Sequence, residues 1–281
     1  MLLDIKNNPL WLAGPDCGIT LYSTEGDDGR IEVRECAGLR WLHFQNGSVE
    51  TVMSLEDPNR LVLDYIRAMM VILVFIPRPT TLLNLGLGGG AIHRFCKKHL
   101  PQTQVTTVEA NKEVVDICRE YFHLDQEAEN IHISDAQSFL QSHLSSDTHA
   151  IYDGILVDLF CNEGIAPCLF DPNFFHQIKQ TLSESGVAVF NIIVNDQNHL
   201  NTIFTHIWKA FSGKALCFNL DDCSNVLVMG FGSEDVDRKV HTIYRNANSC
   251  CQLTQVNFRN YVDILVRCNG TKNGKLKFIA S

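Results

Sequence analysis

Four groups that could take part in chemistry stand directly after short apolar segments of the chain. The first is the glycine loop at residues 86–90, with the sequence GLGGG. The others are the carboxylates of Glu109, Asp135 and Asp158, each of which follows a later apolar segment. Glycine permits positive φ and lets a ligand approach bare backbone at the start of a helix. Carboxylates can accept hydrogen bonds from hydroxyl and amino groups, so these residues together predict a site for a nucleoside cofactor.

Strands and helices alternate along the part of the chain that would position these groups. Strands are predicted at residues 81–85, 104–108, 131–133, 155–157 and 187–194. Helices are predicted between them at residues 91–99, 112–122, 136–143 and 171–182. Apolar strands in alternation with helices are typical of a parallel sheet with helices on both faces. Because ligands in such folds bind at the carboxyl ends of the strands, the four groups would meet there in a Rossmann-like α/β domain.

The segments on either side of this region have a different character. Residues 1–56 contain short alternating segments and the turn signal Asn46-Gly47, which predict a small N-terminal β unit. The remainder, residues 57–281, is predicted to be one catalytic domain that holds the cofactor.

Two further elements are predicted within that larger domain. Asp57 and Pro58 fit the cap and first turn of a helix that leads into the first strand. Gly186 is expected to close a later helix, and residues 216–220 and 226–231 are expected to form a terminal pair of strands.

Bulk composition excludes several classes of protein. The chain has 23 basic and 32 acidic residues, a net charge of -9, which argues against nucleic-acid binding and mildly favours a cationic substrate. Its 11 cysteines form no CxxC pair, so neither a metal site nor a disulfide framework is expected. The longest apolar run, residues 68–76, is too short to span a membrane, and no signal-peptide pattern is present. We expect a cytoplasmic protein with reduced thiols and no membrane contact.

Each of the four groups also has an ordinary structural interpretation. The glycine loop could be a tight turn, Asp135 could cap a helix, and Glu109 could be a solvated residue at a strand end. Their order, with each one at a predicted strand terminus, favours the nucleoside site.

A dinucleotide is the first rival ligand for this site. Gly86, Gly88 and Ala91 satisfy the dinucleotide fingerprint, and Glu109 lies at about the expected distance for an acid that binds ribose. A pyrophosphate leaves the two later aspartates unexplained, whereas a compact adenosyl-sulfonium ligand uses all four strand ends. We therefore expect a ligand of the S-adenosylmethionine type rather than NAD.

From about residue 33 to residue 194 the chain resembles the spermidine synthase (polyamine aminopropyltransferase) family and its methyltransferase-like relatives. The matching segments are residues 83–90, 108–115, 133–139, 152–158 and 164–175. The resemblance implies a class I methyltransferase fold with a mostly parallel seven-stranded sheet, and it implies a homodimer.

The resemblance also implies roles for particular residues. Glu109 would bind the ribose, Asp135 and Ala136 the adenine, and Asp158 would be the catalytic residue. The cofactor-binding candidates are Gly86, Leu87, Gly88, Gly89, Gly90, Glu109, Asp135 and Ala136. The substrate-binding candidates are Glu50, Tyr65 and Glu163.

The chain departs from the family's pattern where amine groups would be held. Gly88 stands where the family usually has an aspartate that grips the amine of decarboxylated S-adenosylmethionine. Arg67 stands where the family has an acid, and the second acid after Asp158 is missing, although Glu163 lies nearby. The family's Asp-Gly-x-x-Gln becomes residues 46–50, with the sequence NGSVE.

These departures determine which hypothesis about function is the main one and which are alternatives. An anion at position 88 would repel the carboxylate of intact S-adenosylmethionine, whereas Gly88 tolerates it. The main hypothesis is therefore methyl transfer from S-adenosylmethionine to a small-molecule amine or other acceptor, with Asp158 as general base or amine-orienting group. The alternative is an aminopropyltransferase that makes spermidine or a related polyamine from decarboxylated S-adenosylmethionine. A non-catalytic family member and an NAD-dependent oxidoreductase are further hypotheses.

Overall fold

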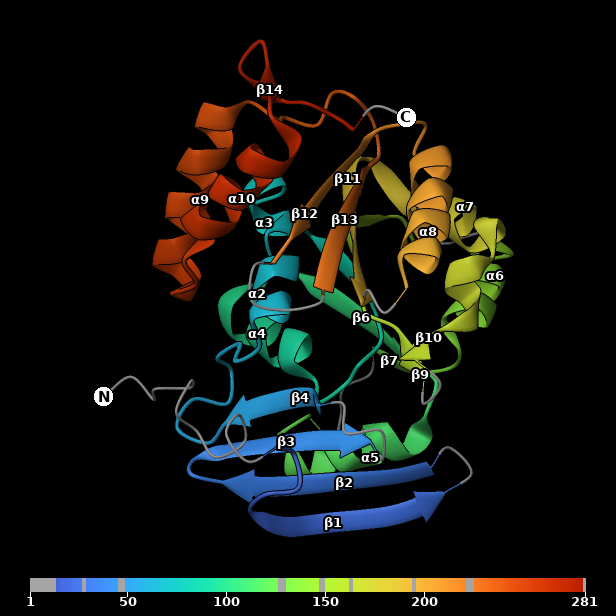
Figure 1. Ribbon diagram of the computed structural model, residues 1–281, viewed down its shortest axis with the longest axis vertical. Coiled ribbons are helices and arrows are strands. Elements are labelled where there is room, and N and C mark those ends of the chain that lie inside the picture. The colour runs from blue at the N-terminus through green and yellow to red at the C-terminus, as the bar shows by residue number, and fades with distance from the viewer. Residues whose placement is uncertain are drawn as a thin grey trace.

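A seven-stranded mixed sheet forms the centre of the protein (Figure 1), which was analysed as a computed structural model. The structure describes residues 14–26, 29–44, 49–125, 130–146, 150–161, 164–193, 196–220 and 225–279. The strands are β5 (Thr81–Leu85), β6 (Gln104–Glu109), β7 (Ile131–Ile133), β8 (Tyr152–Val157), β11 (Leu182–Ile193), β12 (Ala215–Asn219) and β13 (Asn225–Phe231). Their order is β12-β13-β11-β8-β5-β6-β7, and β13 runs antiparallel to both of its neighbours. The predicted Rossmann-like fold and its terminal strand pair are thus confirmed.

The chain reverses its direction of travel across the sheet between β5 and β8. From β5 it proceeds outward to β6 and β7, and it then returns to β8 on the other side of β5. Such a switch point leaves a crevice at the carboxyl ends of the two strands. The glycine loop follows β5 and Asp158 follows β8, so the topology brings both to this crevice.

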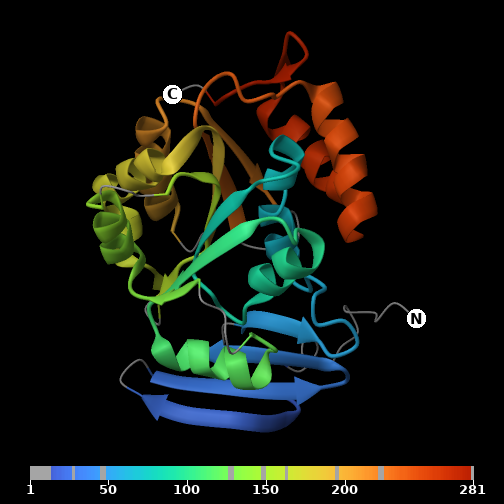
Figure 2. The ribbon, with the colours of Figure 1, turned by 180° about the vertical axis from the view of Figure 1, so that it is seen from behind.

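Helices cover both faces of the sheet (Figures 1 and 2). One face packs against α2 (Asp64–Met69), α3 (Ile72–Phe75), α4 (Ala91–His99), α9 (Val240–Thr254) and α10 (Phe258–Asn269). The other packs against α6 (Ala136–Leu144), α7 (Pro172–Thr181) and α8 (Gln197–Ala210). Buried apolar side chains on each side form a separate core, as the two-sided burial of parallel strands requires.

A four-stranded antiparallel sheet lies across the carboxyl edge of the central sheet (Figure 1). Its strands are β1 (Ile19–Gly26), β2 (Gly29–Cys36), β3 (Leu39–Phe44) and β4 (Val49–Ser54). Its apolar face packs against α5 (Lys112–Tyr121) and against Leu87 of the glycine loop. This is the predicted N-terminal β unit, although the predicted domain boundary at residue 56 and the Asn46-Gly47 turn are untested, the latter because it lies outside the described residues.

The helix predicted to start at Asp57 and Pro58 begins later, so that prediction was wrong. Asp57 instead closes a turn, in which its Oδ1 accepts a hydrogen bond from the backbone N–H of Asn59 at 3.2 Å. The helix α2 starts only at Asp64. Leu61 is buried in irregular chain before that helix, so its burial does not require helical backbone.

The helix α7 is also followed by a strand earlier than predicted. β11 begins at Leu182, and Gly186 lies inside this strand instead of closing a helix. A Cβ at Gly186 would lie 2.7 Å from the Leu182 side chain and 2.9 Å from the Asp153 carbonyl oxygen, so close packing explains the glycine. Within the ranges that the structure describes, no helix combines the length and the apolar character needed to cross a membrane.

Candidate active site at the carboxyl edge of the central sheet

An inner cavity of about 100 Å³ lies at the switch point between β5 and β8. The polar part of its wall comes from Glu50, Tyr65, Glu109, Ser134 and Asp158, together with the backbone of Gly86 and Gly88. The structure therefore brings together residues from the N-terminal sheet, from α2 and from the ends of four central strands. The predicted candidates Glu50, Tyr65, Glu109, Ala136 and Asp158 share this cavity, whereas Glu163 lies outside the described residues.

Gly86 and Gly89 serve the close packing of the loop. The Gly86 φ is +98°, and a Cβ there would lie 2.1 Å from the Asp158 carbonyl oxygen. A Cβ at Gly89 would lie 2.1 Å from the Thr51 methyl group on β4. Neither position has room for a side chain, because each touches another segment of the site.

Gly88 differs from these two glycines because it faces open space. It has a φ of +50°, and the nearest atom to a Cβ built there is the Glu50 carbonyl oxygen, 3.8 Å away. A side chain at position 88 would therefore point into the inner cavity beside Glu50. Leu87 and Gly90 have structural roles. Leu87 is buried under the N-terminal sheet, and Gly90 precedes α4 with a φ of +71°.

Glu109 fastens the glycine loop to the end of β6. One carboxylate oxygen accepts a hydrogen bond from the backbone N–H of Leu87 at 3.0 Å, and the other accepts one from Asn111 at 2.9 Å. Burial raises the pKa of this carboxyl group, while the backbone hydrogen bonds act in the opposite direction. Glu109 also lines the inner cavity, and its role toward ribose stays a prediction.

Asp135 and Ala136 occupy the start of α6. The Asp135 carboxylate accepts a hydrogen bond from the backbone N–H of Ser138 at 2.9 Å, which is the helix-capping role considered from the sequence. Hydrogen bonds with Ser138 lower its pKa. Ser134 and Ala136, on either side of it, line the inner cavity. The role of this segment toward adenine stays a prediction.

Asp158 is positioned by a chain of side-chain amides. The Asn225 amide donates to the Asn191 side-chain oxygen at 2.8 Å, and the Asn191 amide donates to Asp158 Oδ1 at 2.7 Å. Burial raises the pKa of Asp158 to about 6, against the lowering effect of hydrogen bonds from Asn191 and Tyr65. Sequence reasoning missed both asparagines. The available signal was a polar residue inside the otherwise apolar strand β11, where Asn191 is buried.

Glu50 reaches the inner cavity from β4, on the wall opposite the central sheet. Burial raises the pKa of its carboxyl group to about 7, and the charges of Asp158 and Glu109 add to the increase. Within the described ranges, no Lys, Arg or His forms an ion pair with Glu50, Glu109 or Asp158. Three carboxylates thus converge on one cavity without a basic partner.

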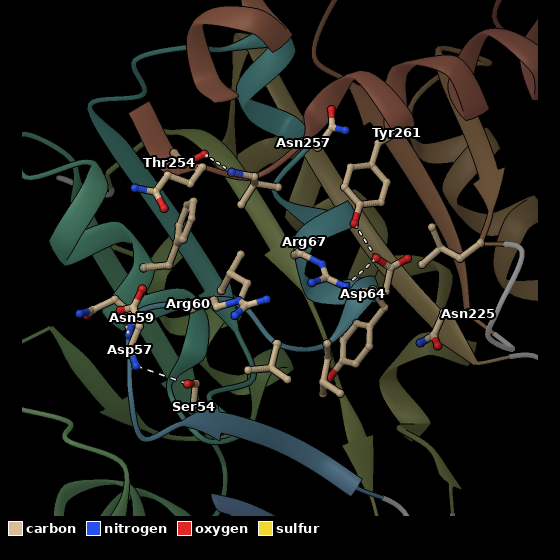
Figure 3. Close-up of a pocket in the computed structure, with 18 of the residues that line it drawn as sticks. Ser54, Asp57, Asn59, Arg60, Asp64, Arg67, Asn225, Thr254, Asn257 and Tyr261 are labelled. Carbon is tan, nitrogen blue, oxygen red and sulfur yellow. Dashed lines mark hydrogen bonds and ion pairs between the residues drawn. The ribbon is translucent and has the colours of Figure 1, made fainter. Parts of the chain in front are cut away.

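An outer cavity of about 1290 Å³ adjoins the inner one (Figure 3). The two cavities share Glu50, Tyr65 and Phe160 in their walls. The outer walls come from the chain before and within α2, from α4, and from α9 and α10 near the C-terminus. The two cavities therefore meet at these three residues.

Comparison with known proteins assigns the chain to an established group. Residues 65–214 match the Spermine/spermidine synthase domain. The polyamine aminopropyltransferase of Neisseria meningitidis is 30% identical over 87% of this chain and 92% of its own length. The eEF1A lysine and N-terminal methyltransferase of Mus musculus is 26% identical over 49% of this chain and 21% of its own length.

A solved structure shows the same architecture. The spermidine synthase from Thermotoga maritima superposes with a TM-score of 0.65 at 16% identity, over 88% of this chain and 84% of that one. The fold expected from the sequence is confirmed by this likeness. Both kinds of curated relative are transferases, and the prediction that this chain is a transferase is thus confirmed.

Proposed function

We propose that this chain, which belongs to the spermine/spermidine synthase domain family, transfers an aminopropyl group from decarboxylated S-adenosylmethionine to an amine. The observation that carries the proposal is the convergence of Glu50, Glu109 and Asp158 on one cavity without a basic partner among the described residues. This reaction was the alternative expected from the sequence, and it fits the site better than methyl transfer.

The preference rests on the charge of the donor. Decarboxylated S-adenosylmethionine carries an ammonium and a sulfonium group, and both are favoured beside carboxylates. Intact S-adenosylmethionine has an additional carboxylate on the same arm. If the donor's carboxylate lay about 4 Å from a carboxylate of the site, the two would repel by about 4 kcal/mol at the effective dielectric constant of a partly buried site.

Gly88 taken alone favours the intact cofactor. The missing aspartate does remove one anion from the glycine loop. Glu50 adds a carboxylate to the same cavity from the opposite wall, and its backbone carbonyl oxygen lies 3.8 Å from the Cβ position at residue 88. The net charge that faces the donor arm is therefore still negative.

Asp158 would act on the attacking amine. When bound, the donor supplies an electrophilic carbon next to its sulfonium sulfur. The amine lone pair forms the new C–N bond as the C–S bond breaks, and the bonding electrons leave with sulfur as a neutral thioether. The amine proton passes to the Asp158 carboxylate, which Asn191 orients through its hydrogen bond of 2.7 Å.

The two donors can be compared directly by calorimetry. We expect the purified chain to bind decarboxylated S-adenosylmethionine at least about tenfold more tightly than the intact form. Glu50→Gln should reduce this ratio, because it removes the charge that distinguishes the two arms. An exposed carboxylate on α5 offers a matched control, and Asp116→Asn should leave the ratio unchanged. Tighter binding of intact S-adenosylmethionine, together with methyl transfer, would overturn the proposal.

A further inference from the structure

The wall of the outer cavity contains guanidinium groups as well as carboxylates. Arg60 and Arg67 both belong to its wall (Figure 3). Arg67 projects from α2, and Arg60 comes from the irregular chain before this helix. The inner cavity differs in this respect, because every charged residue in its wall is a carboxylate.

Arg67 pairs with Asp64 of its own helix, and Asp64 is also contacted by Tyr261 of α10. Arg67 Nη2 donates to Asp64 Oδ1 at 3.0 Å, and the Tyr261 hydroxyl donates to the same oxygen at 2.6 Å. Asp64 is therefore already neutralised and hydrogen-bonded. Both contacts occupy Oδ1 of Asp64, while Arg67 still has further N–H donors to offer.

No carboxylate within the described ranges pairs with Arg60. Figure 3 shows its side chain reaching into the cavity. Besides Asp64, the acids in the outer wall are Glu50, which also lines the inner cavity, and Glu56 and Asp57, which are exposed at the surface. The Asp57 carboxylate also closes its own turn by accepting from Asn59. An acceptor that extends from the inner cavity would thus meet carboxylates first and guanidinium groups beyond them.

We propose that the acceptor is an ω-amino acid, an amine with a carboxylate at its other end. This inference rests on the proposed function and adds the chemistry of the far end of the acceptor. The amine would lie at Asp158, and the carboxylate would bind Arg60 and Arg67. The planar guanidinium group matches a carboxylate with two parallel hydrogen bonds, whereas a second ammonium group would be repelled there.

The experiment compares acceptors in pairs of equal length with decarboxylated S-adenosylmethionine as donor. The pairs are β-alanine with propane-1,3-diamine, 4-aminobutyrate with butane-1,4-diamine, and 5-aminovalerate with pentane-1,5-diamine. Release of 5′-methylthioadenosine measures the rate, and mass spectrometry identifies the product. For the best length we expect kcat/KM to be at least about tenfold higher for the amino acid than for its diamine.

Variants test whether the two arginines cause this preference. Arg60→Gln and Arg67→Gln should each raise KM for the amino acid about tenfold and reduce the preference over the diamine. Arg67→Glu should reverse the preference. Arg60→Gln breaks no ion pair among the described residues, so it serves where Arg67 variants fail to fold. Arg245→Gln, an exposed position on α9, is the matched control and should change neither value.

The outcomes separate this inference from the proposed function. Transfer to diamines in preference to amino acids would overturn the inference and leave the proposed function in place. Equal losses for both kinds of acceptor in the arginine variants would also overturn it, since they would indicate a purely structural role. Absence of aminopropyl transfer to every acceptor would overturn both.

Discussion

Two glutamates of the N-terminal sheet, Glu32 on β2 and Glu50 on β4, have opposite surroundings. The Glu32 side chain is 2% exposed and accepts from Arg34 Nε at 2.9 Å. Arg30 pairs with its other oxygen, and His43 Nε2 lies 3.1 Å away. Burial alone would raise the pKa of Glu32, but Arg34 and Arg30 lower it on balance. Glu50 has no such partner among the residues that the structure describes, and its pKa is raised to about 7.

The difference distinguishes a carboxylate that serves the fold from one that serves a ligand. Burying a charge is costly unless it is paired, and the fold itself supplies the pairing for Glu32. Glu50 faces Asp158 and Glu109 across a cavity instead. We infer that a cationic ligand supplies the missing pairing, so that Glu50 destabilises the empty protein and contributes to binding.

The largest expected effect belongs to the inner cavity. Asp158→Asn should lower kcat by about 10²–10⁴-fold, because the amide cannot take the amine proton. Release of 5′-methylthioadenosine measures this loss. Thermal unfolding should show no destabilisation, because the amide still accepts from Asn191 and no longer carries a buried charge. Retention of full activity would show that Asp158 is not the proton acceptor.

The next largest effect should be a loss of stability when Glu32 is replaced. Glu32→Gln should lower the free energy of unfolding by about 3 kcal/mol, because it leaves Arg34 and Arg30 without their buried partner. Denaturant unfolding measures the change, with Glu35→Gln on the same strand as a more exposed control. Donor affinity in the folded variant should not change. If Glu32→Gln instead lost donor binding and kept its stability, Glu32 would serve the ligand as Glu50 does, and the distinction between the two glutamates would be wrong.

The smallest effect is a gain in stability from Glu50→Gln. A carboxyl group whose pKa is raised in the folded state contributes stability below its ordinary pKa and loses that contribution as the pH rises through the folded value. For Glu50 this loss occurs between about pH 4.5 and about pH 7. The variant should therefore be more stable than the natural chain by about 1–2 kcal/mol at about pH 8, and equal to it at about pH 4.

Donor binding should have the opposite dependence on pH. Ionised Glu50 attracts the ammonium group, so affinity for decarboxylated S-adenosylmethionine should rise about tenfold from about pH 6 to about pH 8. Calorimetry at several pH values measures this rise of affinity with pH, and the rise should be smaller in Glu50→Gln. A rise that persists in the variant would assign the titration to another group, and Asp158 is then the first candidate, because its pKa is raised to about 6.

The choice between methyl and aminopropyl transfer depends on residues that lie far apart in the sequence. Gly88 is visible in the sequence, and taken alone it favours the carboxylate of intact S-adenosylmethionine. The Glu50 carbonyl beside it comes from a different sheet, 38 positions earlier in the chain. No pattern within the glycine loop reveals that Glu50 lines the same cavity.

The sequence by itself determined the fold class, the glycine loop and the carboxylates at the strand ends. These features depend on local patterns: apolar strands alternate with helices, and the polar groups stand where the strands end. The tertiary structure alone decided which charges face one another. Asn225 reaches Asp158 through Asn191, and Tyr261 reaches Asp64 across 197 positions of chain. Electrostatic surroundings depend on distances in space, and only the folded chain sets those distances.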